Sequence, residues 1–262
     1  MSIVEIVFSS DFFFTSIRLM TPILFAALAC MTFSKGGIDP IGTEGIMLLC
    51  ALAGPVGGYF TGSALGGVLI AMAVGIVMAF VFGYFTLILD TNPVLAGIAL
   101  NTFSGGLTIF LTYYLTGNKG STQSLNSPVV PNINIPVLEN IPVLGSIISG
   151  HSVLTYVSFL LVVLLTLFFW KTPYGVRIRA VGENEKSAAS VGVNIMKYKY
   201  IALLIAGGLA GLGGAYMSMS YVSMFSRDMI AGRGWIGMAA ESMGFGTPWR
   251  FTGTMLIFGM AD

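Results

Sequence analysis

The chain has 262 residues, of which 55% are hydrophobic and only 9% are charged, whereas soluble domains carry about 25% charged residues. So few charges cannot cover a water-facing surface, which excludes an ordinary soluble protein and makes lipid the solvent for much of this one. The net charge of +1 gives no electrostatic basis for binding nucleic acid, so the composition predicts an all-α, polytopic membrane helix bundle, a single domain over residues 1–262.

Apolar stretches of about 20 residues, long enough to cross a bilayer as a helix, follow one another along the chain. In chain order, we expect spans at 16–33, 45–60 and 63–85, within 91–118 from Pro93 onward, at 153–170 and within 200–226. The stretch 235–262 is apolar but interrupted by glycine and proline, which predicts a short or re-entrant segment followed by the start of one more helix. The total is roughly seven to eight spans or partial spans. The chain stops at Asp262, so we expect that last helix either to be short or to be truncated at its C-terminus.

Two polar regions interrupt the apolar stretches. Residues 117–150 hold four of the ten prolines, so we expect an irregular loop there. Residues 171–199 hold half of the twelve basic residues, an excess that is typical of cytoplasmic loops. We therefore place 171–199 inside the cell and 117–150 and the N-terminus outside, although a re-entrant segment near 34–44 would reverse the N-terminal orientation.

The cytoplasmic loop contains a candidate docking helix. The segment GENEKSAAS, residues 182–190, begins with Gly182, which we expect to break the preceding structure. It continues as a helix-forming run with Asn184 as its N-cap. A short helix on the cytoplasmic face is suited to docking another protein; the alternative is a positively charged loop that only sets the orientation of the chain.

Polar side chains also fall at membrane depth, where they are costly unless paired. Glu44 opens the second span and either belongs to an ordinary loop or lines a polar pathway beside a re-entrant turn. Asn101 lies in mid-span and faces either a neighbouring helix or a conduit. Glu241 is expected to pair with Arg233 or Arg250. The residues that we predict to line a substrate pathway are Gly42, Glu44, Gly45 and Asn101.

Glycine is unusually frequent, with 34 residues, well above the usual share of about 7%. Gly207, Gly211 and Gly214 recur at helical spacing along one face of the span within 200–226. Small residues let helix backbones approach closely in a membrane, where lipid gives no hydrophobic drive for packing. We predict these three as helix-packing residues, in a bundle whose helices either slide on one another or pack statically.

Signatures of enzyme chemistry are absent from the sequence. It contains no GxxxxGK[ST] phosphate loop, so it cannot cradle ATP phosphates by itself, and no HExxH or CxxC. His151 is the only histidine, which we interpret as an interfacial residue. Cys30 and Cys50 lie in apolar surroundings and are interpreted as small buried hydrophobic residues. We therefore predict no metal site, no cofactor and no catalytic residue.

Three segments carry a likeness to a known family. The longest is TPYGVRIRAVGENEKSAASVGVNIMKYKYIALLIAGGLAGLGGAYMS, residues 172–218, which resembles the signature of permease subunits of bacterial ATP-binding-cassette (ABC) importers. The likeness is strongest to the nucleoside-import branch of the group that also includes ribose-type and branched-chain amino-acid permeases. Residues 231–262 and IGTEGIML, 41–48, resemble two further blocks, so the likeness covers about residues 16–262. Glu241 and the turn at 247–249 depart from the usual pattern.

The resemblance implies a type II ABC importer-like permease and a division of labour. Two permease subunits, often paralogues, would form the pathway, two cytoplasmic ABC ATPase subunits would supply energy, and an extracellular solute-binding protein would deliver solute. The chain would lie in the bacterial plasma membrane, in contact with lipid and with no nucleic-acid partner. The ATPase-coupling residues that the resemblance places on this sequence are Arg179, Gly182, Glu183, Asn184, Ala188, Ala189 and Gly192.

The function that we predict is ATP-driven import of a small polar solute by a chain that is not itself an enzyme. Nucleosides are favoured by the family likeness, and a sugar such as ribose is the alternative within the same class. An ion-coupled secondary transporter is a second class, which would show inverted repeats and coupling carboxylates at mid-span; Glu44 and Glu241 are its only candidates. An intramembrane enzyme or scaffold is a third class.

Overall fold

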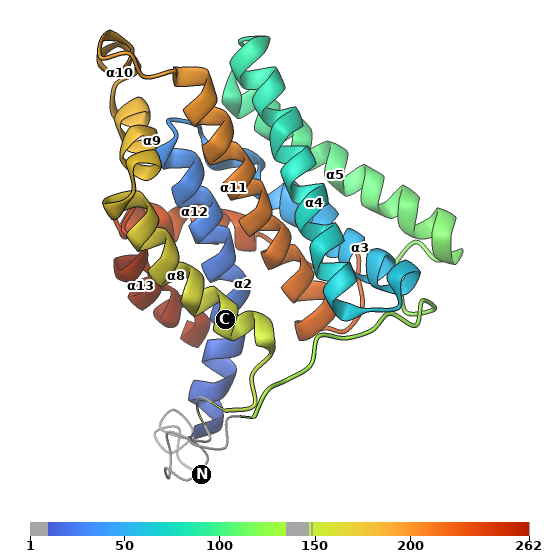
Figure 1. Ribbon diagram of the computed structural model, residues 1–262. Coiled ribbons are helices and arrows are strands. Elements are labelled where there is room, and N and C mark those ends of the chain that lie inside the picture. The colour runs from blue at the N-terminus through green and yellow to red at the C-terminus, as the bar shows by residue number, and fades with distance from the viewer. Residues whose placement is uncertain (1–9, 135–146, 148, 262) are drawn as a thin grey trace.

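The computed structural model describes residues 10–134, 147 and 149–261, and the regular structure of these residues is helical (Figure 1). The helices, in chain order, are α2 (Ser10–Lys35), η1 (Pro40–Gly42), α3 (Thr43–Thr61), α4 (Ala64–Gly83), η2 (Tyr84–Ile88), α5 (Pro93–Thr116), α8 (Val153–Lys171), α9 (Pro173–Glu183), α10 (Glu185–Ser190), α11 (Ile195–Tyr216), η3 (Met217–Tyr221), α12 (Arg233–Met243) and α13 (Pro248–Ala261). The predicted all-α fold is confirmed. Part of the predicted outer loop 117–150 lies outside the described residues.

Six of the described helical segments are long and apolar enough to cross a membrane. They run from Ser10–Lys35, Pro40–Thr61, Ala64–Ile88, Pro93–Thr116, Val153–Lys171 and Ile195–Tyr221. α12 and α13 add two shorter helices of 11 and 14 residues, which meet at the glycine and proline breaks that the sequence shows near residue 245. The predicted polytopic helix bundle is confirmed with six candidate spans in the described residues, and α12 and α13 occupy the stretch 235–262 where the sequence predicted a short or re-entrant segment and the start of another helix.

Helix ends follow local sequence signals. Gly62 ends α3 in the left-handed conformation, with φ of 65°, which glycine adopts without strain. Asn92 caps α5 by accepting a hydrogen bond from the N–H of Val94 at 2.9 Å. Asn194 caps α11 in the same way, accepting from the N–H of Lys197 at 3.1 Å. This second cap explains why α11 begins at Ile195, inside the range 171–199 that the sequence assigned to the loop.

α2, α3 and α11 form the centre of the bundle, while α4, α5 and α8 are largely exposed. α11 packs against α2, α3 and α4, whereas α5 packs mainly against α3 and η1. The exposed faces of α4, α5 and α8 carry Leu, Val, Ile and Phe side chains, which suits helices that face lipid. Cys30 and Cys50 are buried free thiols in the central helices, as the sequence predicted.

The glycine face of α11 sets how closely the central helices approach. A Cβ at Gly207 would collide with the carbonyl oxygen of Gly75 in α4, and one at Gly211 would lie 2.7 Å from the Cα of Met72. A Cβ at Gly214 would meet the backbone of α3. The three predicted packing residues therefore face α3 and α4 at backbone contact, a distance that only glycine permits.

The polar connections separate to opposite ends of the bundle (Figure 1). α9 and α10 lie at the end where α2 finishes, which we predict to face the cytoplasm because of its basic residues. The beginning of α2 lies at the other end (Figure 1), where the ring of Phe14 stacks on His151 with centroids 4.1 Å apart. His151 is buried there, and burial lowers its pKa. The predicted placement of the N-terminal side opposite 171–199 is consistent with this arrangement.

Alanine at Gly207 should destabilise the bundle, because the added methyl group meets backbone atoms that cannot rotate away. We expect Gly207→Ala to lower the free energy of unfolding by about 2 kcal/mol. The matched control is Gly208→Ala on the same helix, where the nearest atom to a Cβ is a side-chain carbon of Ile76 at 3.8 Å. This control should keep or raise stability, since alanine favours a helix over glycine by about 1 kcal/mol. Thermal unfolding of the purified chain in detergent measures both, and equal melting temperatures would contradict the packing argument.

Candidate functional site

α3 begins inside the bundle rather than at the end where α9 and α10 lie. A Cβ at Gly42, just before α3, would lie 3.0 Å from a side-chain carbon of Leu100. Leu100 stands seven residues into α5, which is about 10 Å along the helix axis. The free N–H groups of the first turn of α3 are therefore at membrane depth, where they need partners other than water.

Asn101 of α5 supplies these partners. Its Oδ1 accepts a hydrogen bond from the N–H of Gly45 at 2.8 Å, and its Nδ2 donates to the carbonyl oxygen of Ile41 at 2.9 Å. One amide thus satisfies a donor and an acceptor at the beginning of α3. A Cβ at Gly45 would lie only 2.7 Å from Oδ1 of Asn101, so glycine at position 45 leaves the room that this cap requires.

Glu44 caps a second helix that also begins inside the bundle. Its two carboxylate oxygens accept hydrogen bonds from the N–H groups of Gly232 at 2.8 Å and Gly234 at 2.7 Å, at the N-terminus of α12. A negative side chain is stabilised at this end of a helix by the helix dipole. A Cβ at Gly234 would lie 2.6 Å from Oε2, so here too glycine makes space for the capping oxygen.

We call this arrangement the mid-membrane junction: Gly42, Glu44, Gly45, Asn101, Gly232 and Gly234. It brings together all four residues that the sequence predicted for a substrate pathway. Glu44 is neither an ordinary loop charge nor an unpaired carboxylate, and Asn101 is bonded to a neighbouring helix. Both side chains remain partly exposed, so a role in lining a pathway stays a prediction. The signal that sequence reasoning missed is the glycine pair at 232 and 234, whose N–H groups receive Glu44.

Glu241 has a different partner from the predicted arginines. It is buried on α12, and the positive charge that acts on it comes from Lys35 at the end of α2. Both side chains border Gly246, where a Cβ would lie 2.9 Å from Nζ of Lys35 and 3.4 Å from Oε1 of Glu241. Arg233 begins α12, eight residues and about 12 Å before Glu241. Among the described residues no ion pair joins Glu241 to Arg233 or to Arg250, so both predicted pairings are wrong. For Arg233 the separation along the helix is the reason, and the Arg250 guanidinium lies over the ring of Trp249.

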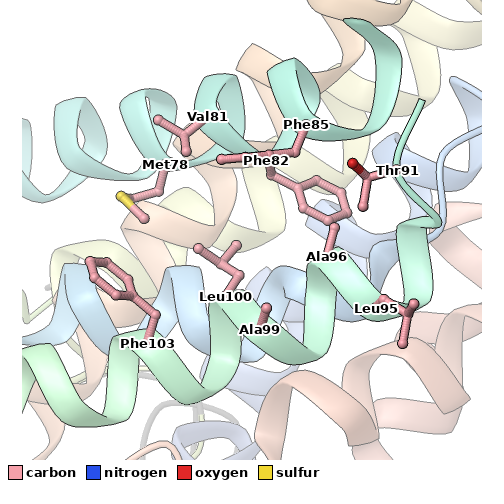
Figure 2. Close-up of a pocket in the computed structure, with 10 residues that line it drawn as sticks. All are labelled: Met78, Val81, Phe82, Phe85, Thr91, Leu95, Ala96, Ala99, Leu100 and Phe103. Atoms are coloured by element: carbon pink, nitrogen blue, oxygen red, sulfur yellow. The ribbon is translucent and has the colours of Figure 1, made fainter. Parts of the chain in front are cut away.

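An apolar groove of about 500 Å³ lies beside the junction, between α4 and α5. Side chains from α4 and η2 face side chains from α5 across it (Figure 2). Phe82 and Leu100 belong both to this lining and to the packing around Gly42. None of the lining residues is charged, so the groove by itself offers a polar solute little beyond apolar contact.

The predicted ATPase-coupling residues divide into two groups. Arg179, Gly182 and Ala188 face the protein: the Arg179 guanidinium lies over the ring of Trp170 at 5.0 Å, Gly182 packs on the turn after α2, and Ala188 is buried. The residues that are exposed are Glu183, Asn184, Ala189 and Gly192. Val191, 77% exposed, belongs with this outward group and was missed, because an exposed valine has no motif of its own.

The beginning of α10 confirms one local prediction and corrects another. Asn184 is its N-cap, accepting from the N–H of Ser187 at 3.0 Å, as predicted. Gly182 does not break the preceding helix, because α9 continues through it to Glu183. The absence of a side chain at Gly182 serves close packing instead, since a Cβ there would collide with the carbonyl oxygen of Lys35.

Two polar contacts tie α9 and α10 to α11. Arg177 of α9 donates to the hydroxyl of Tyr198 at 2.7 Å, and Lys199 forms an ion pair with Glu185 of α10 at 2.5 Å. These contacts hold α9, α10 and the first turn of α11 together. The exposed surface of α10 therefore belongs to a helix that is held against α11, rather than to an unattached loop.

Comparison with known proteins finds relatives over nearly the whole chain. Residues 12–261 match the family described as the branched-chain amino acid transport system permease component. The guanosine ABC transporter permease protein NupQ of Bacillus subtilis is 31% identical, over 92% of this chain and 77% of NupQ. The putative glucose ABC transporter permease protein TsgC13 of Haloferax volcanii is 29% identical, over 97% of this chain and 77% of TsgC13. The nucleoside ABC transporter permease protein NupC of Lactococcus lactis subsp. cremoris is 29% identical, over 92% of this chain and 77% of NupC.

A second nucleoside ABC transporter permease protein of the same Lactococcus lactis, NupB, is 24% identical over 93% of this chain and 69% of NupB. Among solved structures, an inward-facing conformation of a putative metal-chelate type ABC transporter matches with a TM-score of 0.51. It covers 95% of this chain and 73% of that one at 17% identity. This last likeness concerns the fold alone.

Loss of the Glu44 carboxylate should destabilise the junction in proportion to the hydrogen bonds removed. Glu44→Ala leaves both N–H groups of α12 without partners, so we expect a loss of about 3 kcal/mol in the free energy of unfolding. Glu44→Gln keeps one accepting oxygen and should fall between this variant and the native chain. Glu183→Ala, at an exposed position, is the control and should stay within about 0.5 kcal/mol. Thermal unfolding in detergent gives the order, and a Glu44→Ala chain as stable as the control would refute the capping role.

Proposed function

Because the chain belongs to the family of branched-chain amino acid transport system permease components, we propose that it is the membrane-spanning subunit of an ATP-driven importer of nucleosides. The observation that carries the proposal is the likeness to NupQ, 31% identical over 92% of this chain, joined by NupC at 29%. These relatives are transporter subunits rather than enzymes. The family also favours ATP-driven transport over the ion-coupled alternative.

The ATPase would dock on the exposed surface of α10. This six-residue helix presents all of its side chains except Ala188 to solvent, and Val191 follows it as an exposed apolar residue. The contacts through Arg177 and Lys199 tie this surface to α11. The ATPase can shift the equilibrium between two states of the permease only if it binds them with different affinities. Because α10 is held against α11, docking on α10 would depend on the position of α11.

The solute pathway would run along the free side of α5. This helix packs on α3 with one face, and its other face exposes Thr102 and Gly106 at mid-helix. Small residues such as glycine and threonine at that depth are typical of surfaces where another membrane helix packs closely. A second permease subunit facing the same side would enclose them together with the partly exposed Asn101. Because this chain is similar to both NupC and NupB, a paralogue is a suitable second permease.

The remaining parts of the machine follow from the family. An extracellular solute-binding protein would deliver solute to the end of the bundle opposite α9 and α10, and the complex would sit in the bacterial plasma membrane. TsgC13, named as a putative glucose permease, favours a sugar as the second candidate solute. Nucleosides and sugars share a polar ring with several hydroxyl groups, so the fold alone does not separate them.

Uptake by cells that express the whole transporter tests the substrate. The chain is produced with its second permease, its ATPase and its binding protein in a strain that lacks nucleoside import, and uptake of tritiated guanosine and uridine is compared with that of ribose and glucose. We expect saturable nucleoside uptake that disappears when the ATPase is inactivated. If the cells take up a sugar but no nucleoside, the proposed substrate is wrong. If uptake survives inactivation of the ATPase but is abolished by an ionophore, the chain belongs to an ion-coupled transporter instead.

A bulky residue on the outward face of α10 should prevent ATPase docking. We expect Ala189→Trp to abolish co-purification of the ATPase and solute uptake, because the indole projects from an exposed position into the surface that the ATPase would cover. Ser63→Trp is the matched control, since Ser63 is exposed in the turn between α3 and α4 and makes no capping hydrogen bond. If the ATPase co-purifies equally well with both variants, α10 is not the docking element.

A further inference from the structure

A short segment between α2 and α3, residues 36–42, contacts the cytoplasmic helices at its beginning. We call it the α2–α3 link. A Cβ at Gly182 of α9 would lie 2.9 Å from the N–H nitrogen of Gly37, and a Cβ at Gly36 would lie 2.8 Å from the Cβ of Ala202 in α11. The start of the link therefore packs so closely between α9 and α11 that there is no space for an added side-chain atom.

The other end of the link reaches the mid-membrane junction. The carbonyl oxygen of Ile41 accepts from Asn101 of α5 at 2.9 Å, and a Cβ at Gly97 would lie 2.8 Å from the Cβ of Ile41. Glu44, two residues after the link, caps α12. A single stretch of chain thus touches α9 and α11 at one end and α5 and α12 at or just beyond the other.

Hydrogen bonds, a buried side chain and a proline restrain the link. The N–H groups of Gly36 and Ile38 both donate to the carbonyl oxygen of Phe33, at 2.9 and 3.1 Å, which folds the link back on the end of α2. Ile38 is buried, with 4% of its surface exposed. Pro40 has a fixed φ and starts the helical turn η1. These contacts restrain a link that also contains Gly36, Gly37 and Gly42, so a displacement at Gly36 would be passed on toward Ile41.

No comparably direct connection joins the docking helices to α5 within the described residues. α9 packs against α8, α10, α11 and the end of α2, and α10 packs against α9 and α11. α5 packs against α3, η1, α4 and η2. Because η1 is part of the link, the link is a described segment that contacts α9 near one end and α5 near the other.

We propose that the α2–α3 link transmits the movement of the ATPase-bound helices α9 and α10 to α5 and α12. The proposal rests on the proposed function for the existence of a docked ATPase. It assigns positioning roles to Gly36, Pro40 and Ile41, which touch neither ATPase nor solute. A movement of α9 and α10 would then change the position of α5 beside the pathway through the link.

The test is a distance measurement on the whole complex in lipid nanodiscs. Spin labels are attached at Ser63→Cys, in the turn after α3, and at Asn118→Cys, after α5; both positions are exposed, while Cys30 and Cys50 are buried. ATP binding should shift the distance between the labels in the native link. Pro40→Gly, which softens the link, and Gly36→Ala, which displaces it, should abolish that shift while the ATPase remains bound and hydrolyses ATP.

Two controls separate transmission from a general loss of structure. Ala202→Gly removes the atom that a Cβ at position 36 would meet, so the double variant with Gly36→Ala should recover the shift. Pro131→Gly, at an exposed proline of the outer loop, should keep it. The proposal is overturned if the native complex shows no ATP-dependent shift, if the link variants keep it in full, or if they lose ATPase binding along with it. Because no solute is used, a failed nucleoside uptake experiment would count against the proposed substrate and leave this result standing.

Discussion

A helix that starts inside a bilayer exposes N–H groups that water cannot reach, and the whole interior of this protein is arranged around that constraint. α3 and α12 both begin at membrane depth, and each receives its missing hydrogen bonds from a side chain on another element. An unsatisfied backbone group in hydrocarbon costs several kcal/mol. Asn101 and Glu44 therefore fix where α3 and α12 begin and how α5 lies against them.

Glycine makes these caps possible, so part of the unusual glycine content of the chain is explained by the site. Gly45 and Gly234 lie where a Cβ would occupy the position of the capping oxygen. Gly207, Gly211 and Gly214 play the matching part on α11, where they bring backbones into contact without polar groups. The high glycine content therefore has two uses in one structure, since it allows close apolar packing in the seams and close polar approach at the junction.

Much of the fold could be predicted because each membrane span is marked by its own stretch of sequence. Length and apolar composition locate a span without knowledge of its neighbours, and the predicted cap at Asn184 acts within three residues of itself. The start of α11 was still misplaced, because its first turn carries the lysines that the sequence analysis assigned to a polar loop while it is already helical.

The candidate site was predicted in its residues but not in its bonds. Glu44 and Asn101 stand out in sequence because they are polar within apolar stretches, yet Gly232 is 188 residues from Glu44. Nothing local to either residue marks the other as its partner. The same holds for Glu241, whose neighbour Lys35 comes from a different helix, and for Gly182, whose role depends on the turn that packs against it.

The distribution of contacts is the reason that we propose movement of α5 rather than of the central helices. α11 shares wide buried faces with both α2 and α3, so displacing it against either would open space in the centre of the bundle. α5 is attached along one face only, and its hydrogen bonds to the α3 end run through the single side chain of Asn101. At and before that level an apolar groove, lined on α5 by residues from Leu95 to Phe103, separates α5 from α4. A helix that packs on one face and is hydrogen-bonded through one side chain tilts at lower cost than a helix buried on all sides. In the proposed mechanism, the level of Asn101 is therefore where a displacement of the α3 end would reach α5.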